Sequence, residues 1–233
     1  MPKKIEFVAQ DEHTWAVCPK PYPAAKGLPK WWKDIPAYID GRDKISLNPQ
    51  PTVTVKRCAP TLDILTMGYY IPLWADLLVE QVDGTPLIKW NTQKNVVGVW
   101  NSSQLENFQI EEGHSRFAFK NYHGWTIKTP PGWSCLFIHP VAYPNTAFKT
   151  ISGVVDTDVF VGEINVPFTI KEGFEGLIEM GTPMIQVIPF KRESWESDFS
   201  VKGPREHEFD MEKIYAKVVR SYSSTFKSNK KYR

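Results

Sequence analysis

The chain has 233 residues, of which 42% are hydrophobic and nine are tryptophan, and its formal net charge is +2 at pH 7. This composition is ample for a sizeable core, and the small net charge gives no reason to expect nucleic acid or an anionic membrane as a partner. No apolar run approaches the roughly 20 residues that cross a bilayer. Residues 1–15 lack the apolar stretch of a signal peptide.

Three widely separated cysteines, Cys18, Cys58 and Cys135, show no CxxC spacing. That pattern argues against a disulfide framework and against a zinc ribbon. Three reduced thiols in a cytoplasmic protein are therefore expected.

The N-terminal part is rich in proline and tryptophan: residues 15–36 read WAVCPKPYPAAKGLPKWWKDIP. Pro29 is placed to start a short helix that carries Trp31 and Trp32, and Pro36 to follow its end. Such a segment cannot make a core of its own, so its rings must pack onto the body of the same chain or onto a neighbour. Residues 1–50 are assigned as an N-terminal arm packed on the domain.

Residues 51–205 are predicted to form one domain of short strands. Alternating or continuous apolar runs favour strands at 52–57, 69–81, 87–90, 95–100, 116–120, 125–129 and 133–140. Asp83-Gly84 is typical of a tight hairpin turn, Pro72 favours an edge or a bulge, and Gly68 is suited to end a short helix over 58–67. Many short strands with turn residues between them indicate a sandwich or barrel rather than a βαβ fold.

Residues 206–233 are predicted to hold a C-terminal helix and a basic tail. Asp210 can cap the helix, and an apolar stripe follows at helical spacing. That stripe consists of Tyr215, Val218, Val219, Tyr222 and Phe226. The tail KSNKKYR is interpreted as solvated, with a weak contact to nucleic acid as the alternative.

Most motifs that carry chemistry are missing from the sequence. The five histidines form no HxH or HxxxH pair, and no GxSxG, GxGxxG or GxxxxGK[ST] run occurs. Cys135 and His139 share one strand face and could form a thiolate dyad. A cysteine in an apolar strand is more often an inert small hydrophobe. No metal site is predicted.

Residues 151–190 form the part of the chain with the strongest local pattern, which is strand, turn and strand. Asp156 and Asp158 are two residues apart in its turn and share a face when the backbone is extended. Because two adjacent carboxylates repel, one pKa should rise or a cation should bridge them. The alternative is structural, since aspartates in turns commonly bond their own backbone amides.

Three segments resemble the trimeric dUTPase and dCTP-deaminase superfamily. They are TPPGWSCLFIHP at 129–140, GVVDTDVFVGEINVPF at 153–168 and EMGTPMIQVIPF at 179–190. The resemblance implies a dUTPase-like β-clip and a homotrimer. It also gives Asp156 the role of the catalytic aspartate that activates water, Asp158 that of a structural second aspartate, and Gln186 that of holding subunits and phosphates.

The chain departs from that family where the nucleotide would be held. Phe160 or Val159 stands where the sugar-stacking tyrosine belongs, residues 139–144 read HPVAYP instead of the phosphate-binding PRSS-type motif, and the glycine-rich C-terminal arm is missing. A triphosphate needs several preorganised donors and usually Mg²⁺. A degenerate nucleotide site is therefore expected, with no cofactor unless nucleotide binding, and Mg²⁺ with it, is retained.

A second resemblance covers nearly the whole chain. Three segments carry it, in this order along the chain: PxPAxKxLPxWWK near the start, VKRCAPTLDILTMGYYIPLWADL in the middle and GTPMIQVIPFKRE near the end. It resembles a family of proteins from tailed phages, cyanophages among them, and from bacteria. The resemblance implies a phage-encoded protein located in the host cytoplasm or in the virion, and it implies no mechanism.

The leading hypothesis is a non-enzymatic binding or interaction protein whose partner is a host or phage protein. Its fold is expected to be mainly β, with an N-terminal arm and a C-terminal helix. The predicted ligand-binding residues around Asp156 are Asp158, Phe160, Trp133, Tyr143 and Gln186. One alternative is a hydrolase in which Asp156 activates water for attack on a nucleotide or small molecule. Another is a structural or decoration protein of the virion.

Overall fold

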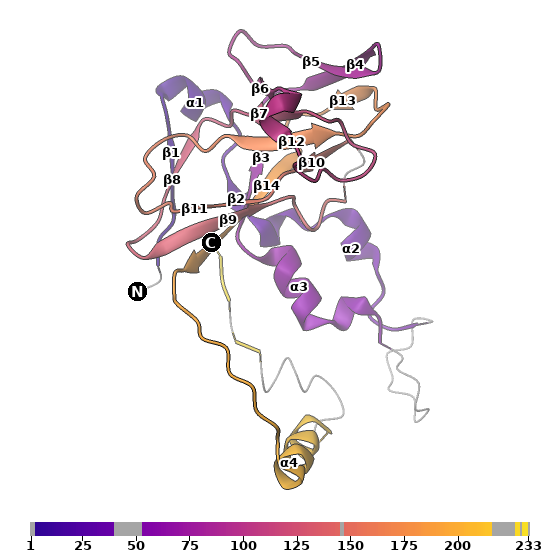
Figure 1. The fold of residues 1–233 in the computed structure, drawn as a ribbon, viewed down its shortest axis with the longest axis vertical. Helices are drawn as coiled ribbons and strands as arrows, with labels where there is room; N and C mark the ends of the chain where they lie inside the picture. The colour runs from indigo at the N-terminus through magenta and orange to yellow at the C-terminus, as the bar shows by residue number, and fades with distance from the viewer. Residues whose placement is uncertain (1–2, 40–52, 145–146, 216–226, 229, 233) are drawn as a thin grey trace. The chain divides into compact units, whose positions relative to one another are not determined.

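A computed structural model describes residues 3–39, 53–144, 147–215, 227–228 and 230–232, and Figure 1 draws the chain. The fold is mainly β with antiparallel sheets, as the sequence predicts. The chain divides into two compact units. The first comprises Met1–Pro29, Thr66–Arg192 and Tyr232–Arg233, and the second comprises Lys30–Leu65 and Glu193–Lys231.

The first unit contains nearly all of the regular structure. Its elements are β1 (Glu6–Ala9), α1 (Glu12–Val17), β2 (Tyr22–Pro23), η1 (Ala24–Gly27), β3 (Tyr69–Pro72), β4 (Leu77–Val82), β5 (Thr85–Trp90), β6 (Val97–Trp100), η4 (Ser102–Leu105), β7 (Ala118–Asn121), β8 (Trp125–Lys128), β9 (Trp133–Ile138), β10 (Phe148–Thr150), β11 (Gly153–Val155), β12 (Val166–Ile170), β13 (Gly176–Ile178) and β14 (Pro183–Lys191). The second unit holds α2 (Lys30–Asp34), η3 (Val55–Arg57), α3 (Ala59–Thr66, whose last residue belongs to the first unit) and α4 (Pro204–Tyr215).

The strands of the first unit form four antiparallel sheets. Their orders are β11-β9-β14-β3-β2, β10-β12-β7-β6, β13-β4-β5 and β1-β8. Side chains from all four sheets meet in one apolar core, because alternate residues of each strand point inward. Phe168 is fully buried in this core, and its ring centroid lies 5.7 Å from that of Phe119 and 6.0 Å from that of Phe148.

Several local predictions are confirmed. Asp83 and Gly84 both have positive φ and join β4 to β5 as a hairpin. The pairing of β3 with β14 shifts in register opposite Pro72, which matches the expected bulge. Helix α2 follows Pro29 and buries Trp32, and Gly68 follows α3 with a φ of +73°.

The predicted strand at 52–57 is wrong for its described residues. Val53 makes an isolated bridge and Val55–Arg57 form the 3-10 helix η3. The Thr54 hydroxyl accepts a hydrogen bond from the Lys56 amide, and this side-chain cap competes with strand pairing. Strand β1 and helix α1 lie in a region for which the sequence suggested neither.

The predicted start of the C-terminal helix is also wrong. Helix α4 begins at Pro204, a residue favoured in the first helical turn, so Asp210 lies inside the helix and pairs with Lys202. The stripe positions after Tyr215 lie outside the described residues. In the basic tail, Lys227 and Lys230 lie 2.8 and 2.7 Å from the Asp63 carboxylate of α3, so both lysines are paired.

In the described ranges, no helix is both long and apolar enough to cross a bilayer.

Candidate functional site

The turn after β11 is positioned by two neighbouring strands. Val155 of β11 lies opposite Cys135 of β9, which lies opposite Pro189 of β14. This register brings Asp156, just after β11, to Ser134 of β9, and it brings the end of β14 to the same place. The residue that follows β14 is Arg192.

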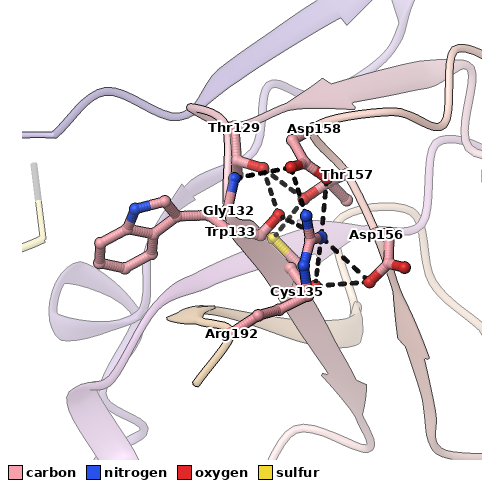
Figure 2. Close-up of polar contacts among 9 residues, drawn as sticks. Thr129, Gly132, Trp133, Cys135, Asp156, Thr157, Asp158 and Arg192 are labelled. Atoms are coloured by element: carbon pink, nitrogen blue, oxygen red, sulfur yellow. Dashed lines mark hydrogen bonds and ion pairs between the residues drawn. The ribbon is translucent and has the colours of Figure 1, made fainter. Parts of the chain in front are cut away.

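Arg192 closes the aspartate turn (Figure 2). Its two terminal nitrogens donate to the two carboxylate oxygens of Asp158 at 2.7 and 2.5 Å. Its Nη1 also lies 3.2 Å from Asp156 Oδ1 and 3.0 Å from Ser134 Oγ. The cation that bridges the two carboxylates is therefore a guanidinium of the same chain, held in bidentate geometry.

The polar side chains of the turn also form hydrogen bonds with neighbouring residues. Ser134 Oγ donates to Asp156 Oδ1 at 2.6 Å, and the Gly132 amide donates to Asp158 Oδ2 at 2.8 Å. Thr157 points the other way: its hydroxyl lies 2.7 Å from that of Thr129 and 3.4 Å from the Cys135 sulfur. The side chains of the turn are thus hydrogen-bonded on both sides, as expected of a rigid scaffold.

The two aspartates differ in environment. The Asp158 side chain is 5% exposed, and the Arg192 guanidinium holds its pKa at about 2. The same ion pair raises the pKa of Arg192. The Asp156 side chain is 56% exposed, and Figure 2 shows its second oxygen pointing away from the cluster. Asp158 is therefore a buried partner of Arg192, whereas Asp156 keeps a solvent-facing carboxylate.

The two predicted aromatic residues nearest the turn do not enclose it. The ring of Trp133 points away from the cluster, to which the residue contributes only its backbone carbonyl (Figure 2). Phe160 donates its amide to the Asp156 carbonyl, while its ring is 44% exposed and lies over Gly162.

Gln186 lies in the first half of β14, away from Arg192, and Tyr143 lies in the loop after β9. Gln186 is fully buried, accepts a hydrogen bond from the Val141 amide at 3.1 Å and donates to the Met67 carbonyl at 2.8 Å. Tyr143 donates its hydroxyl hydrogen bond to the Gly27 carbonyl and packs edge-on against Tyr70. Six residues of strand, about 20 Å, separate Gln186 from Arg192. The structure therefore brings Asp156 and Asp158 together and keeps Tyr143 and Gln186 apart from them.

The geometry of Cys135 and His139 favours the interpretation of Cys135 as an unreactive buried cysteine over a thiolate dyad. Cys135 is fully buried, and burial raises its pKa to about 11. His139 Nε2 lies 3.2 Å from the Tyr143 carbonyl, its Nδ1 accepts from the Thr150 amide, and burial lowers its pKa to about 4. Four strand residues, about 13 Å, separate the two backbones, so His139 does not lie beside the thiol as a base.

An apolar pocket of about 390 Å³ lies beside β11, and Val155 belongs to its wall. It falls within the size range of small-molecule sites. Its lining comes from the end of β6, the loop through η4, β9, residues 151–155 and residues 164–167. The larger side chains among these are Trp100, Leu105, Phe108, Phe137, Ile151 and Ile164. We call this the β11 pocket.

One cation lies near Trp100, which is a lining residue of the β11 pocket. Lys120 of β7 places its Nζ 5.5 Å from the Trp100 ring centroid. The Cα of Lys120 also pairs across the sheet with that of Pro167, another lining residue. The lining of the pocket is apolar, and a positive charge lies beside two of its lining residues.

Sequence reasoning missed two parts of this region. The sequence analysis did not select Arg192 as a partner of the aspartates. The only local indication was that a basic residue directly follows an apolar strand, 34 residues beyond Asp158. The sequence analysis also described 101–116 only as a loop, so Leu105 and Phe108 were not considered. Among the described residues, no three His, Cys, Asp or Glu side chains lie together in a way that could hold a metal ion.

Comparison of the chain with protein-family models, with curated proteins and with solved structures found no match.

Proposed function

We propose that this chain is a binding protein in which the β11 pocket holds an aromatic or apolar group and the aspartate turn serves as a rigid wall. The observation that carries the proposal is the placement of Arg192. Its guanidinium is bonded to both carboxylates of the turn, Asp156 and Asp158. The turn is therefore held by ion pairs within the chain, and it lies next to an apolar cavity. Pockets of this kind recognise ligands by apolar contact plus a few polar groups.

The finer assignments of scaffold and source rest on the sequence resemblances. We propose a dUTPase-like β-clip with a degenerate nucleotide site, supported by the three segments within 129–190. A phage origin, with a role beside host or phage proteins, is supported only by the resemblance along the whole chain. The antiparallel, mainly β architecture is compatible with both proposals.

Fluorescence titration with 1-anilinonaphthalene-8-sulfonate tests the pocket, because this probe is aromatic and anionic like the ligand that the lining and Lys120 favour. Phe108→Ala should weaken probe binding by roughly 10-fold, since a phenyl group contributes about 1–2 kcal/mol to such contacts. Phe209→Ala is the matched control, because Phe209 is exposed to a similar degree (56% against 51%) but belongs to α4. Equal affinity in both variants would contradict the proposal.

One observation favours a rival function, that of a hydrolase: the exposed carboxylate of Asp156 could orient a water molecule. Calorimetric titration with deoxynucleotides in the presence of Mg²⁺ separates the two proposals. Tight binding with turnover, abolished by Asp156→Asn in a folded protein, would establish the rival and reject the non-enzymatic proposal.

A further inference from the structure

A second, smaller pocket lies beside α1, and we call it the α1 pocket. Its volume is about 190 Å³, which corresponds to roughly six water molecules at about 30 Å³ each. All of its lining residues belong to the first unit, and none of them lines the β11 pocket. The α1 pocket is therefore a separate candidate site, built from one compact part of the chain.

Glu163 gives the α1 pocket a fixed carboxylate. Its Oε1 accepts a hydrogen bond from the Gly124 amide at 2.6 Å, and its Oε2 accepts one from Gln10 Nε2 at 3.0 Å. Both donors are uncharged, so they orient the carboxylate without neutralising it. Because each carboxylate oxygen can accept two hydrogen bonds, Glu163 keeps the capacity to accept from a ligand.

The positive charge in the lining already has a partner. Lys94 Nζ lies 2.8 Å from Asp11 Oδ2, and Asp11 Oδ1 accepts from the Thr14 amide at 2.6 Å. Burial raises the pKa of the Cys18 thiol to about 11, and the charges of Lys94, Asp11 and Glu163 all act on this thiol, so they lie around one pocket. One positive and two negative charges leave a net charge of −1, which favours a cation as the ligand.

The floor of the α1 pocket is buried and partly aromatic. Thr14, Cys18 and Trp74 are 5%, 7% and 8% exposed. Tyr122 also contributes to the lining, and its carbonyl accepts from Trp74 Nε1 at 2.6 Å. Aromatic rings attract ammonium groups, and the buried floor favours a short apolar body attached to the charge.

We propose that the α1 pocket binds a small organic ion with a single ammonium group. The ammonium donates hydrogen bonds to Glu163, and the short apolar chain lies against Thr14, Cys18 and Trp74. A diamine is disfavoured because Lys94 repels a second positive charge. An amino acid is disfavoured because its carboxylate would lie beside Asp11, which already pairs with Lys94.

Proton–nitrogen NMR of the full chain tests the class of ligand. At pH 7, n-propylamine should shift the indole N–H signal of Trp74, with an affinity in the millimolar range because the probe has few atoms. The neutral analogue 1-propanol and the anionic analogue propionate should not shift this signal at the same concentrations. Absence of a shift with n-propylamine, or an equal shift with 1-propanol, overturns the proposal.

Glu163→Gln tests the residue that carries the proposal. The variant removes the negative charge but keeps a carbonyl oxygen as an acceptor, so n-propylamine should bind roughly 10-fold more weakly. The matched control is Glu80→Gln, which removes a carboxylate that is 40% exposed and paired with Lys89, and it should leave binding unchanged. Unchanged affinity in the folded Glu163 variant overturns the assigned role.

Lys94→Met separates a cation site from a site for amino acids. Loss of the ammonium removes a repulsion and frees Asp11, so n-propylamine should bind several-fold more tightly. Lys89→Met is the control, because Lys89 is also an exposed lysine in an ion pair (55% against 46%), and it should have no effect. The zwitterion β-alanine should bind more weakly than n-propylamine. Tighter binding of β-alanine that Lys94→Met abolishes would overturn the assigned class.

A competition experiment distinguishes the two pockets. The dye 1-anilinonaphthalene-8-sulfonate reports on the β11 pocket, and n-propylamine should not displace it, since the two sites share no lining residue. Displacement of the dye would place the amine in the β11 pocket and overturn the assignment. Because each pocket has its own probe, failure of one site is distinguishable from failure of the other.

Discussion

Asp158 and Arg192 form a bidentate ion pair across two segments that are 34 residues apart in the sequence. The pair fixes the end of β14 against the turn that follows β11. Because the Asp158 side chain is 5% exposed, the guanidinium replaces water as its solvent. The geometry explains why a turn with two aspartates is compatible with a stable fold.

Replacing Asp158 with Asn should lower the thermal unfolding midpoint by several degrees, because Arg192 and the Gly132 amide lose a charged acceptor. Asp156→Asn is the control: its carboxylate is more than half exposed, so its effect should be smaller. The measurement is circular dichroism during heating at pH 7. A larger loss in the Asp156 variant would reverse the roles assigned to the two residues.

The same ion pair predicts a pH dependence. The pKa of Asp158 is about 2 in the folded chain and about 3.9 in an unfolded one. Its contribution to stability is therefore complete above pH 4 and is lost as the pH falls from about 4 towards 2. Asp158→Asn should flatten the fall in unfolding midpoint over this range. An unchanged slope would show that other carboxyl groups control acid unfolding.

His123 predicts a second pH dependence, at higher pH. Its side chain is 1% exposed, its Nδ1 accepts from the Trp125 amide, and burial lowers its pKa to about 4. The unfolded chain therefore binds a proton near pH 6.5 that the folded chain does not. The stability lost as the pH falls from 6.5 to 4 is about 3 kcal/mol for this group.

Urea unfolding of His123→Gln between pH 7 and pH 4 measures that contribution. Gln cannot titrate, so the variant should lose less stability than the wild type over this interval. His139→Gln removes a partly buried histidine whose pKa is also lowered to about 4, and its effect should have the same sign. Equal losses of stability in the wild type, His123→Gln and His139→Gln would contradict the lowered histidine pKa values as the cause.

Gly68 should tolerate no side chain. Its φ is +73°, and a Cβ there would overlap the Val187 carbonyl oxygen. Gly68→Ala should therefore cost about 3 kcal/mol or more, through the positive φ and the clash together. Gly173→Ala is the control, with a φ of +69° and open space around the Cβ, and should cost only about 1–2 kcal/mol. Urea unfolding measures both, and equal costs would exclude the clash.

Thiol labelling of the native protein should modify one cysteine rapidly. Cys58 is exposed and hydrogen bonds lower its pKa, whereas Cys18 and Cys135 are buried and burial raises the pKa of each to about 11. Mass spectrometry after brief exposure to iodoacetamide should find a single adduct, which Cys58→Ser abolishes. Rapid modification of Cys135 would instead support an activated thiol.

The sequence by itself determined the mainly β class and many local features. Alternation located most of the strands, and Asp83-Gly84 and Gly68 marked a hairpin and a helix end, because side-chain period and backbone φ depend on neighbouring residues. The same local reasoning failed at Val55–Arg57 and at Asp210, where a threonine cap and a proline start decided the outcome.

Only the tertiary structure decided what the aspartate turn contacts. The paired aspartates identified the turn as a candidate site from the sequence. The register of β11, β9 and β14 determines that Arg192 reaches the turn. Likewise, the β11 pocket is assembled from five separate segments, and Gln186 lies a strand length from Asp158. Such contacts join residues far apart in sequence, so no local pattern encodes them, and they appear only when the strands have paired.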